Sequence, residues 1–271
     1  MKKKFYLSEK FQSIFFPILY LILGLGIVLT GCFIFYNKYY QPILVDGASM
    51  QPTLVGGGSS GSTVEYKGSN YPVYFRNHYG IADLHPSAVD HLKRFDVCVT
   101  YYPNSWSAED GASIIKRVWG FPGETLNLTY DNESTSFTFT ISKNEKVIKE
   151  YHAPVVEITR KYEGEYYVNG KRKYTTASKT FTAAEFFVGN KTFYVNVSST
   201  KRVFKKTLAD NEYFVMGDNW GASSDSYSNK DNHDLLTKKY LQGKAICINA
   251  YASSSNSKAV AIHKIKGWYL F

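Results

Sequence analysis

The sequence predicts a mostly β protein that follows a single N-terminal transmembrane helix. Three observations support this class: a long apolar segment near the N-terminus, a composition rich in Tyr, Val and Thr, and a series of short alternating segments further along the chain. The 271 residues include 23 tyrosines and 18 phenylalanines. The part after the apolar segment is long enough for one hydrophobic core and a smaller appended domain.

The apolar segment, residues 11–37, carries no charged side chain. As a helix it would be roughly 40 Å long, which exceeds the roughly 30 Å hydrocarbon core of a bilayer. Pro17 and the three glycines inside it are tolerated in membrane helices. The alternative is a cleaved secretory signal, but the apolar part of such a signal usually has only about 7 to 15 residues. We therefore expect residues 11–37 to form a transmembrane helix.

Lysines flank this segment unequally. Four of them precede it, at positions 2, 3, 4 and 10, and only Lys38 follows it closely. The positive-inside rule then places residues 1–10 in the cytoplasm and the main part of the chain outside it. No later stretch is long and apolar enough to cross back. The expected location is the cell membrane, with a single pass.

The formal net charge is +9. Because an exported region does not meet nucleic acid, we expect no nucleic-acid partner, and the charge favours anionic lipid or cell-wall polymer. Solubility alone explains the charge equally well.

Three cysteines occur, and Cys32 lies in the apolar segment, so no disulfide framework is expected. Cys98 and Cys247 lie in strand-like runs, which favours buried free thiols; a bridge between them is the alternative. The spacing of His78, His85 and His91 matches no zinc motif. We expect no metal and no cofactor.

The middle of the chain is organised by turns and short strands. GGGSSGST, residues 56–63, predicts a flexible loop. Residues 125–197 predict a series of short strands, and Asn169 and Gly170 predict a two-residue hairpin turn. Chemical motifs flank this stretch and none lies inside it. We therefore expect a core formed by residues 38–124 and 211–271, with 125–210 as an inserted β domain.

The segment VDGASMQPTL places a serine, Ser49, directly after the apolar segment. A serine hydroxyl is a poor nucleophile unless a nearby base takes its proton, and the best candidate is Lys116 in IIKRVWGFPGE. To act near neutral pH, the pKa of that lysine must fall from about 10.4 to about 7 or 8, and burial against apolar neighbours can cause this fall. In a strand, Lys116 points away from the face of Arg117, which becomes a solvated or paired cation.

Four segments together carry a family resemblance: ASMQPTL, RFDVCVTYYP, IIKRVWGFPGE and FVMGDNWGASSDS. In this order, behind an N-terminal anchor, they resemble type I signal peptidases, most nearly the single-anchor Gram-positive kind. Each motif is weak alone, and the four in order are specific. The resemblance covers the chain apart from residues 56–91 and 125–210, and it implies a signal-peptidase-like β catalytic core with an inserted smaller β domain.

The resemblance implies a membrane-bound serine endopeptidase that removes signal peptides from exported preproteins with a serine/lysine dyad. Ser49 is then the nucleophile, and Lys116 is the general base and later the general acid. The implied partners are the signal peptides of secreted preproteins and membrane lipid, with the export translocon as a further candidate. The substrate would be an extended peptide with small residues before the cleaved bond, added as a strand to a free sheet edge.

Further motif residues have implied supporting roles. Ser223 and Asp225 correspond to residues that support the lysine, and the backbone N–H of Ser49 would hold the oxyanion. The remaining motif positions are Met50, Pro52, Arg117, Gly217, Asp218 and Asn219. A polar turn that only ends a strand would also explain Asp218 and Asn219.

Three positions depart from the family pattern. Gly47 stands where some members have a hydroxyl that helps the oxyanion, and Trp220 and Tyr227 stand where arginines are usual. We therefore expect Asp225 to lack its usual cationic partner.

These departures keep one alternative open, a non-cleaving signal-peptidase-like chaperone in surface protein or pilus assembly. A self-cleaving repressor would use the same chemistry, but the membrane anchor and the absence of a DNA-binding segment argue against it.

Overall fold

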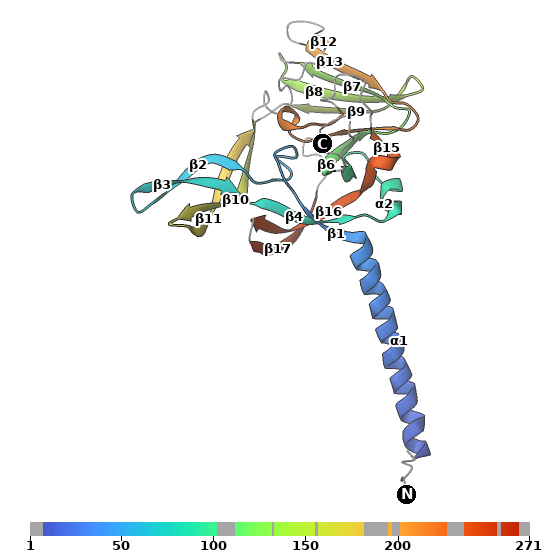
Figure 1. Ribbon diagram of the computed structural model, residues 1–271. Helices are drawn as coiled ribbons and strands as arrows, with labels where there is room; N and C mark the ends of the chain where they lie inside the picture. The colour runs from blue at the N-terminus through green and yellow to red at the C-terminus, as the bar shows by residue number, and fades with distance from the viewer. Residues whose placement is uncertain are drawn as a thin grey trace. The chain divides into compact units, whose positions relative to one another are not determined.

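The computed structural model describes residues 8–101, 112–131, 133–154, 157–181, 195–196, 201–226, 236–253 and 256–265. The chain divides into two compact units, Met1–Gln41 and Pro42–Phe271. The first unit is dominated by one helix, and the second is built mainly of β-strands (Figure 1). The predicted mostly β class is therefore confirmed.

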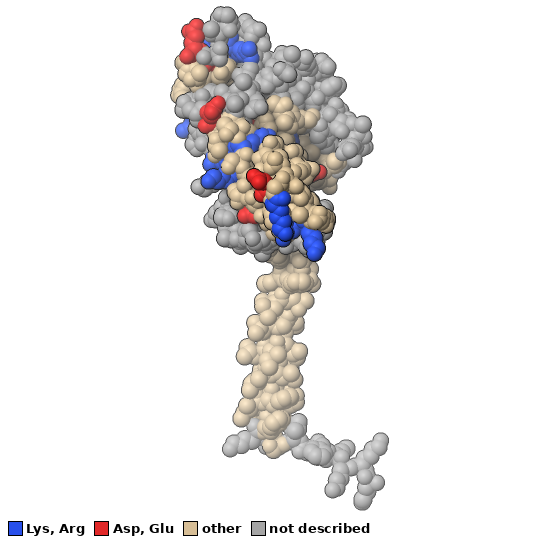
Figure 2. Space-filling model, turned by 90° about the vertical axis from the view of Figure 1, so that its left-hand side faces the viewer, with Lys and Arg blue, Asp and Glu red and all other residues tan. Residues whose placement is uncertain are grey.

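The long helix α1 spans Glu9–Tyr39. It begins at Ser8, whose side chain accepts a hydrogen bond from the backbone N–H of Phe11, as an N-cap residue does. Residues Phe11–Tyr39 have a mean hydropathy of 2.6, and none of the most apolar window is buried within the protein. In Figure 2 most of the visible length of this helix is tan, without charged side chains. By length and composition it can cross a membrane, as predicted, while its orientation stays a prediction.

The largest of the sheets holds eight strands, in the order β1-β4-β16-β5-β6-β14-β15, with β17 paired to β16. Their bounds are β1 Tyr40–Leu44, β4 Asn77–Asp83, β5 Val97–Tyr101, β6 Ser113–Gly120, β14 Glu212–Met216, β15 Leu236–Thr237, β16 Leu241–Ser253 and β17 Asn256–Lys264. Strands from both ends of the second unit thus belong to one sheet.

A second sheet has the order β11-β10-β3-β2. Its strands are β2 Ser59–Tyr66, β3 Ser69–Phe75, β10 Ile158–Val168 and β11 Lys171–Phe181. The expectation of a flexible loop at residues 56–63 was wrong over its second half, because β2 begins at Ser59. The physical reason is found in the residues that follow the glycines in the sequence. Val64 and Tyr66 pack against the main core, and this packing holds the strand in place.

The turn between β10 and β11 confirms the predicted hairpin. Asn169 and Gly170 have φ values of 49° and 73°. Both are left-handed, as a two-residue turn that matches the twist of the strands requires. The pairing runs without a break from Val168 opposite Lys171 to Ile158 opposite Phe181.

The third sheet has the order β12-β13-β7-β8-β9. Its strands are β7 Thr125–Asp131, β8 Ser136–Lys143, β9 Lys146–Pro154, β12 Val195–Asn196 and β13 Lys201–Thr207. In β7 and β8 every second residue is buried, which is the alternation that the sequence predicts. Between Phe181 and the end of the predicted series at residue 197, only β12 lies within the described residues.

The boundaries of the expected inserted domain stay a prediction. Its strands contribute to two different sheets, and β10 pairs with β3, which precedes it by more than 80 residues in the chain. Residues 125–210 are therefore joined by backbone hydrogen bonds to the segment that contains β2 and β3.

Short helical turns within the described residues are α2 Pro86–Asp90, η2 Trp220–Ala222 and η3 Lys238–Tyr240. The histidines have structural roles. His85 caps α2, the ring of His91 contacts the carbonyl of Ser87, and buried His78 accepts a hydrogen bond from Val55. No group of side chains that suits a metal ion occurs in the part of the chain that the structure describes.

The main core joins the sheets through packed aromatic rings. Phe139 is fully buried in β8, and its ring centroid lies 5.0 Å from that of Trp119 and 6.2 Å from that of Phe95. These residues come from three separate segments of the chain. The core therefore connects the third sheet to the strand that carries Lys116.

We expect Phe139→Ala to lower the free energy of unfolding by about 3–5 kcal/mol, because the buried ring leaves a cavity that the core cannot fill. The measurement is urea denaturation in detergent, followed by tryptophan fluorescence. Val147→Ala, in β9, is the control, since Val147 is 61% exposed and should change stability by no more than about 0.5 kcal/mol. Equal effects of the two substitutions would contradict this description of the core.

Candidate functional site

Ser49 lies in a tight turn that follows β1. Within this turn the N–H of Gln51 donates to the carbonyl of Ala48 and the N–H of Leu54 donates to that of Met50, at 3.1 and 2.9 Å. The side chains of Met50 and Leu54 are almost completely buried. Apolar anchors thus fix a turn whose serine lines a cavity.

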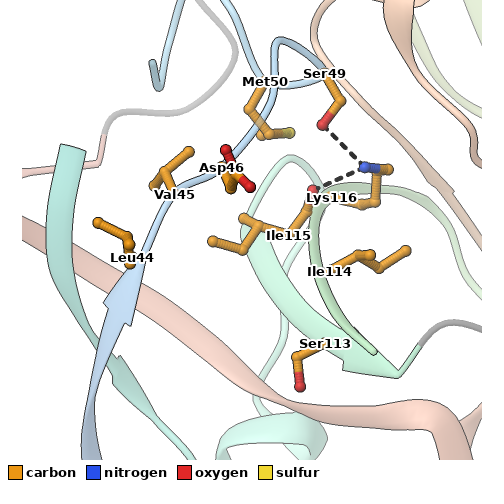
Figure 3. A pocket seen from close by; sticks show the side chains of 9 residues that line it. All are labelled: Leu44, Val45, Asp46, Ser49, Met50, Ser113, Ile114, Ile115 and Lys116. Atoms are coloured by element: carbon orange, nitrogen blue, oxygen red, sulfur yellow. Dashed lines mark hydrogen bonds between the residues drawn. The ribbon is translucent and has the colours of Figure 1, made fainter. Parts of the chain in front are cut away.

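Lys116 lies in β6 and reaches this turn. Its Nζ is 3.0 Å from Oγ of Ser49 and 3.2 Å from the carbonyl oxygen of Ile115 (Figure 3). Only 4% of Lys116 is exposed. An amine removed from water in this way loses the solvation that favours its charged form.

Alternation along β6 gives its neighbouring residues different roles, as the sequence predicts. Ile114 packs with one group of buried side chains, and Ile115 packs with another. Arg117 points away from Lys116 and is completely buried.

Cys98 is the residue of β5 that lies opposite Lys116 in the sheet. It is fully buried, and this burial raises the pKa of its thiol to about 12. The thiol is therefore neutral near pH 7 and brings no negative charge to the lysine. Cys98 and Cys247 are both free, so the bridge that was left open as an alternative is not formed.

Arg117 binds the carboxylate of Asp218 with two hydrogen bonds, of 2.7 Å from Nε and 2.6 Å from Nη2. Both side chains are fully buried. The same guanidinium donates to the carbonyl oxygen of Phe95 at 2.5 Å and to Oγ1 of Thr53 at 3.3 Å, and Thr53 also contacts Asp218. One cation thus connects β6, the Ser49 turn, the segment just before β5 and the loop after β14.

The loop after β14 touches the Ser49 turn directly. The N–H of Asn219 donates to the carbonyl oxygen of Ser49 at 2.9 Å. A side chain at Gly217 would place its Cβ 2.4 Å from that same carbonyl and 2.3 Å from Oγ of Ser223. Glycine is therefore required at position 217 for this close approach.

Asp225 is fully buried and accepts a hydrogen bond of 2.9 Å from the N–H of Gly217. Ser223 is also buried, beside Gly217. The structure therefore brings both residues to the loop that contacts Ser49, while their implied support of the lysine stays a prediction.

Gly47 has φ +77°, a left-handed conformation that strains other residues. Its N–H donates to the carbonyl oxygen of Gly56 at 3.0 Å and to Oδ1 of Asp46 at 2.9 Å. Gly47 thus serves as a turn residue before the serine. A hydroxyl-bearing residue at this position would adopt an unfavourable backbone conformation.

Trp220 is a core residue. It is 1% exposed, and its ring packs edge-on against Trp119 at 5.6 Å and Phe137 at 5.3 Å between centroids. Aromatic packing against β8 thus fixes the start of η2, at the position where the family pattern usually has an arginine. Tyr227 lies outside the described residues.

A cavity of about 110 Å³ opens beside Ser49 and Lys116. Its lining comes from the end of β1 and the turn after it, and from the first half of β6 (Figure 3). The lining residues are Leu44, Val45, Asp46, Ser49, Met50, Ser113, Ile114, Ile115 and Lys116. Among the described residues, β1 is an edge strand, and β14 pairs with β6 only between Arg117 and Gly120. Two strand edges therefore border the cavity.

Sequence reasoning missed the part of Thr53 in the ion-pair network. Thr53 lies inside the ASMQPTL motif, but nothing in its spacing from Arg117 and Asp218 indicates a contact. Only the turn and the sheet register bring these three residues together.

The fold and the site together define a β protein with a serine hydroxyl and a buried lysine amine side by side at a cavity, behind a helix long enough to cross a membrane. The model of the family "Signal peptidase, peptidase S26" matches residues 16–249. The chain belongs to this family, as its four motifs predicted. A search among curated proteins finds no match. Family membership supports a signal peptidase function, with substrates that bear signal peptides.

We expect Asp218→Ala to destabilise the protein by about 3–5 kcal/mol, because it leaves the Arg117 cation buried without its carboxylate. Chemical denaturation measures this change. Asp90→Ala is the matched control: Asp90 also pairs with a cation, Lys238, but both side chains are more than half exposed, so little change is expected. A small effect at Asp218 would mean that the pair does not hold these segments together.

Proposed function

We propose that the protein is a membrane-bound signal peptidase in which Ser49 is the nucleophile and Lys116 is the general base. The observation that carries this proposal is the 3.0 Å contact between Oγ of Ser49 and Nζ of Lys116 beside an open cavity. This distance permits direct proton transfer.

In the first step, Oγ of Ser49 attacks the scissile carbonyl carbon and its proton passes to Nζ of Lys116. The tetrahedral intermediate then collapses with cleavage of the C–N bond, and the lysine ammonium gives its proton to the leaving amine. Water hydrolyses the resulting ester in the second half of the reaction, with Lys116 again as the base. The free enzyme must therefore hold Lys116 neutral. Its burial and the neutral thiol of Cys98 on the next strand both favour this state.

The oxyanion of the intermediate needs hydrogen-bond donors. Within the described part of the chain, the backbone N–H of Ser49 has no hydrogen-bond acceptor, so it is available to a substrate carbonyl. The N–H of Gly47 is already engaged by Gly56 and Asp46. We therefore assign the oxyanion to the Ser49 N–H and give Gly47 a conformational role.

The substrate would bind as an extended strand along the two edges that border the cavity. The end of β1 and residues 113–115 of β6 provide these edges. Main-chain hydrogen bonds to such edges bind a peptide, while the side-chain lining selects its residues. The cavity is small, and aliphatic side chains such as Leu44, Ile114 and Ile115 line part of it, which suits small residues before the cleaved bond.

The proposed location follows from α1 and its flanking lysines. α1 would anchor the enzyme with residues 1–10 in the cytoplasm and the second unit outside. Signal peptides, which are themselves membrane-inserted segments, would then meet the enzyme at the bilayer surface. Lipid and the export translocon are the proposed partners there.

We expect Ser49→Ala to abolish cleavage of a preprotein with a small-x-small site, and Lys116→Ala to lower kcat by about 10²–10⁴, the usual contribution of a general base. The assay uses the full chain in detergent with purified preprotein. Ser134→Ala and Lys146→Ala are the controls, since both residues are exposed and distant in sequence from the site. Full activity in Ser49→Ala would exclude the dyad, and an inactive parent across a panel of preproteins would favour the non-cleaving chaperone.

The dyad also predicts a pH dependence. Because the neutral amine is the active form, the rate of the parent should rise with pH as Lys116 loses its proton. Burial disfavours the ammonium, so the midpoint of the rise should lie below about 10.4, the ordinary pKa of lysine. Initial rates between pH 5 and 11 measure it, with thermal unfolding at each pH to exclude denaturation. A rate that falls through this range would contradict the assignment of Lys116 as the base.

A further inference from the structure

The second sheet, β11-β10-β3-β2, contacts the Ser49 turn at two consecutive residues. The hydroxyl of Tyr162, in β10, donates to the carbonyl oxygen of Pro52 at 3.0 Å. Nζ of Lys179, in β11, donates to Oε1 of Gln51 at 3.1 Å. Both donors lie between residues 125 and 210, the stretch to which the sequence assigns no chemistry.

Tyr162 is built into the core. It is 6% exposed, and its ring packs edge-on against Phe75 of β3, with 5.2 Å between centroids. Burial holds the pKa of its phenol far above the ordinary range, so the hydroxyl keeps its proton and remains a donor. The sheet fixes the position of the Tyr162 hydroxyl, and the hydrogen bond from this hydroxyl fixes the Pro52 carbonyl.

Because Pro52 and Ser49 belong to the same tight turn, fixing the Pro52 carbonyl also restricts the position of Ser49. Pro52 is three residues from Ser49. The hydrogen bond from the N–H of Gln51 to the carbonyl of Ala48 spans Ser49, and the one from the N–H of Leu54 to the carbonyl of Met50 spans Pro52. On its other side, the N–H of Asn219 holds the carbonyl of Ser49. The turn is therefore held from two sides, by the loop after β14 and by the second sheet.

Resting on the proposed function of Ser49, we propose that Tyr162 is a positioning residue for the nucleophile, and that the second sheet holds the Ser49 turn at reaction distance from Lys116. Tyr162 touches neither the substrate nor the reacting atoms. It acts through the Pro52 carbonyl, with Lys179 as a second, weaker support at Gln51. A small displacement of a reacting group can reduce the rate greatly, so this support affects catalysis.

The test is Tyr162→Phe, which removes only the hydroxyl. We expect kcat to fall by about ten-fold or more while KM stays within about two-fold, because the lost contact positions the nucleophile and does not bind substrate. Tyr166→Phe is the matched control. Tyr166 is also buried, lies four residues further along the same strand, and packs against Tyr71 away from the turn. Lys179→Met should give a smaller fall in kcat and serves if Tyr162→Phe does not fold.

A second readout does not need activity. Amide hydrogen exchange of Met50, Gln51, Thr53 and Leu54 in the full chain should become faster in Tyr162→Phe, while the paired residues of β5 and β6 keep their parental rates. Tyr166→Phe should change neither. If the parent cleaves no preprotein, the proposed peptidase function fails, but exchange still decides whether Tyr162 holds the turn.

Three results would overturn the proposal. The first is that Tyr162→Phe has the same kcat and the same amide exchange rates in the Ser49 turn as the unsubstituted protein. Another is an equal loss of kcat in Tyr162→Phe and Tyr166→Phe with lowered thermal stability in both, which would show a role in folding alone. The last is a rise in KM at constant kcat, which would place Tyr162 in substrate binding.

Discussion

The buried ion pair of Arg117 and Asp218 is the interaction on which the site depends. Arg117 follows Lys116 directly in β6, so alternation sends their side chains to opposite faces of the strand. On one face the guanidinium holds Asp218, Thr53 and the carbonyl of Phe95. On the other face the amine meets Ser49. A charge with no access to water needs several fixed partners, and those partners hold the strand that carries the amine in register with the serine turn.

Around this pair the protein combines an open cavity with buried supporting contacts. Ser49 and Lys116 face a cavity, whereas the contacts behind them are buried: Asn219 on the Ser49 carbonyl, Tyr162 on the Pro52 carbonyl and Trp220 in the aromatic core. These buried contacts hold the Ser49 turn from behind. The same burial favours the neutral amine that a proton acceptor requires.

The sequence predicted the elements that depend on local pattern. The absence of charge over residues 11–37 indicated α1, alternation indicated β7 and β8, and Asn169 with Gly170 indicated the hairpin between β10 and β11. It failed where a distant contact overrides local composition. Residues 56–63, rich in glycine and serine, predicted a loop, yet β2 begins at Ser59 because Val64 and Tyr66 pack against the main core. The sequence also assigned no role to Trp220 beyond the departure from the family pattern, and in the structure this residue packs between rings from β6 and β8.

By itself, the sequence determined the family, the apolar helix and the residue types of the site, because motif order and periodicity are properties of the chain alone. The tertiary structure decided the 3.0 Å approach of Lys116 to Ser49, the pairing of Arg117 with Asp218 and the contact of Tyr162 with the serine turn. Each of these joins residues at least 67 positions apart. Their distance is set by sheet order and core packing, which no local pattern encodes.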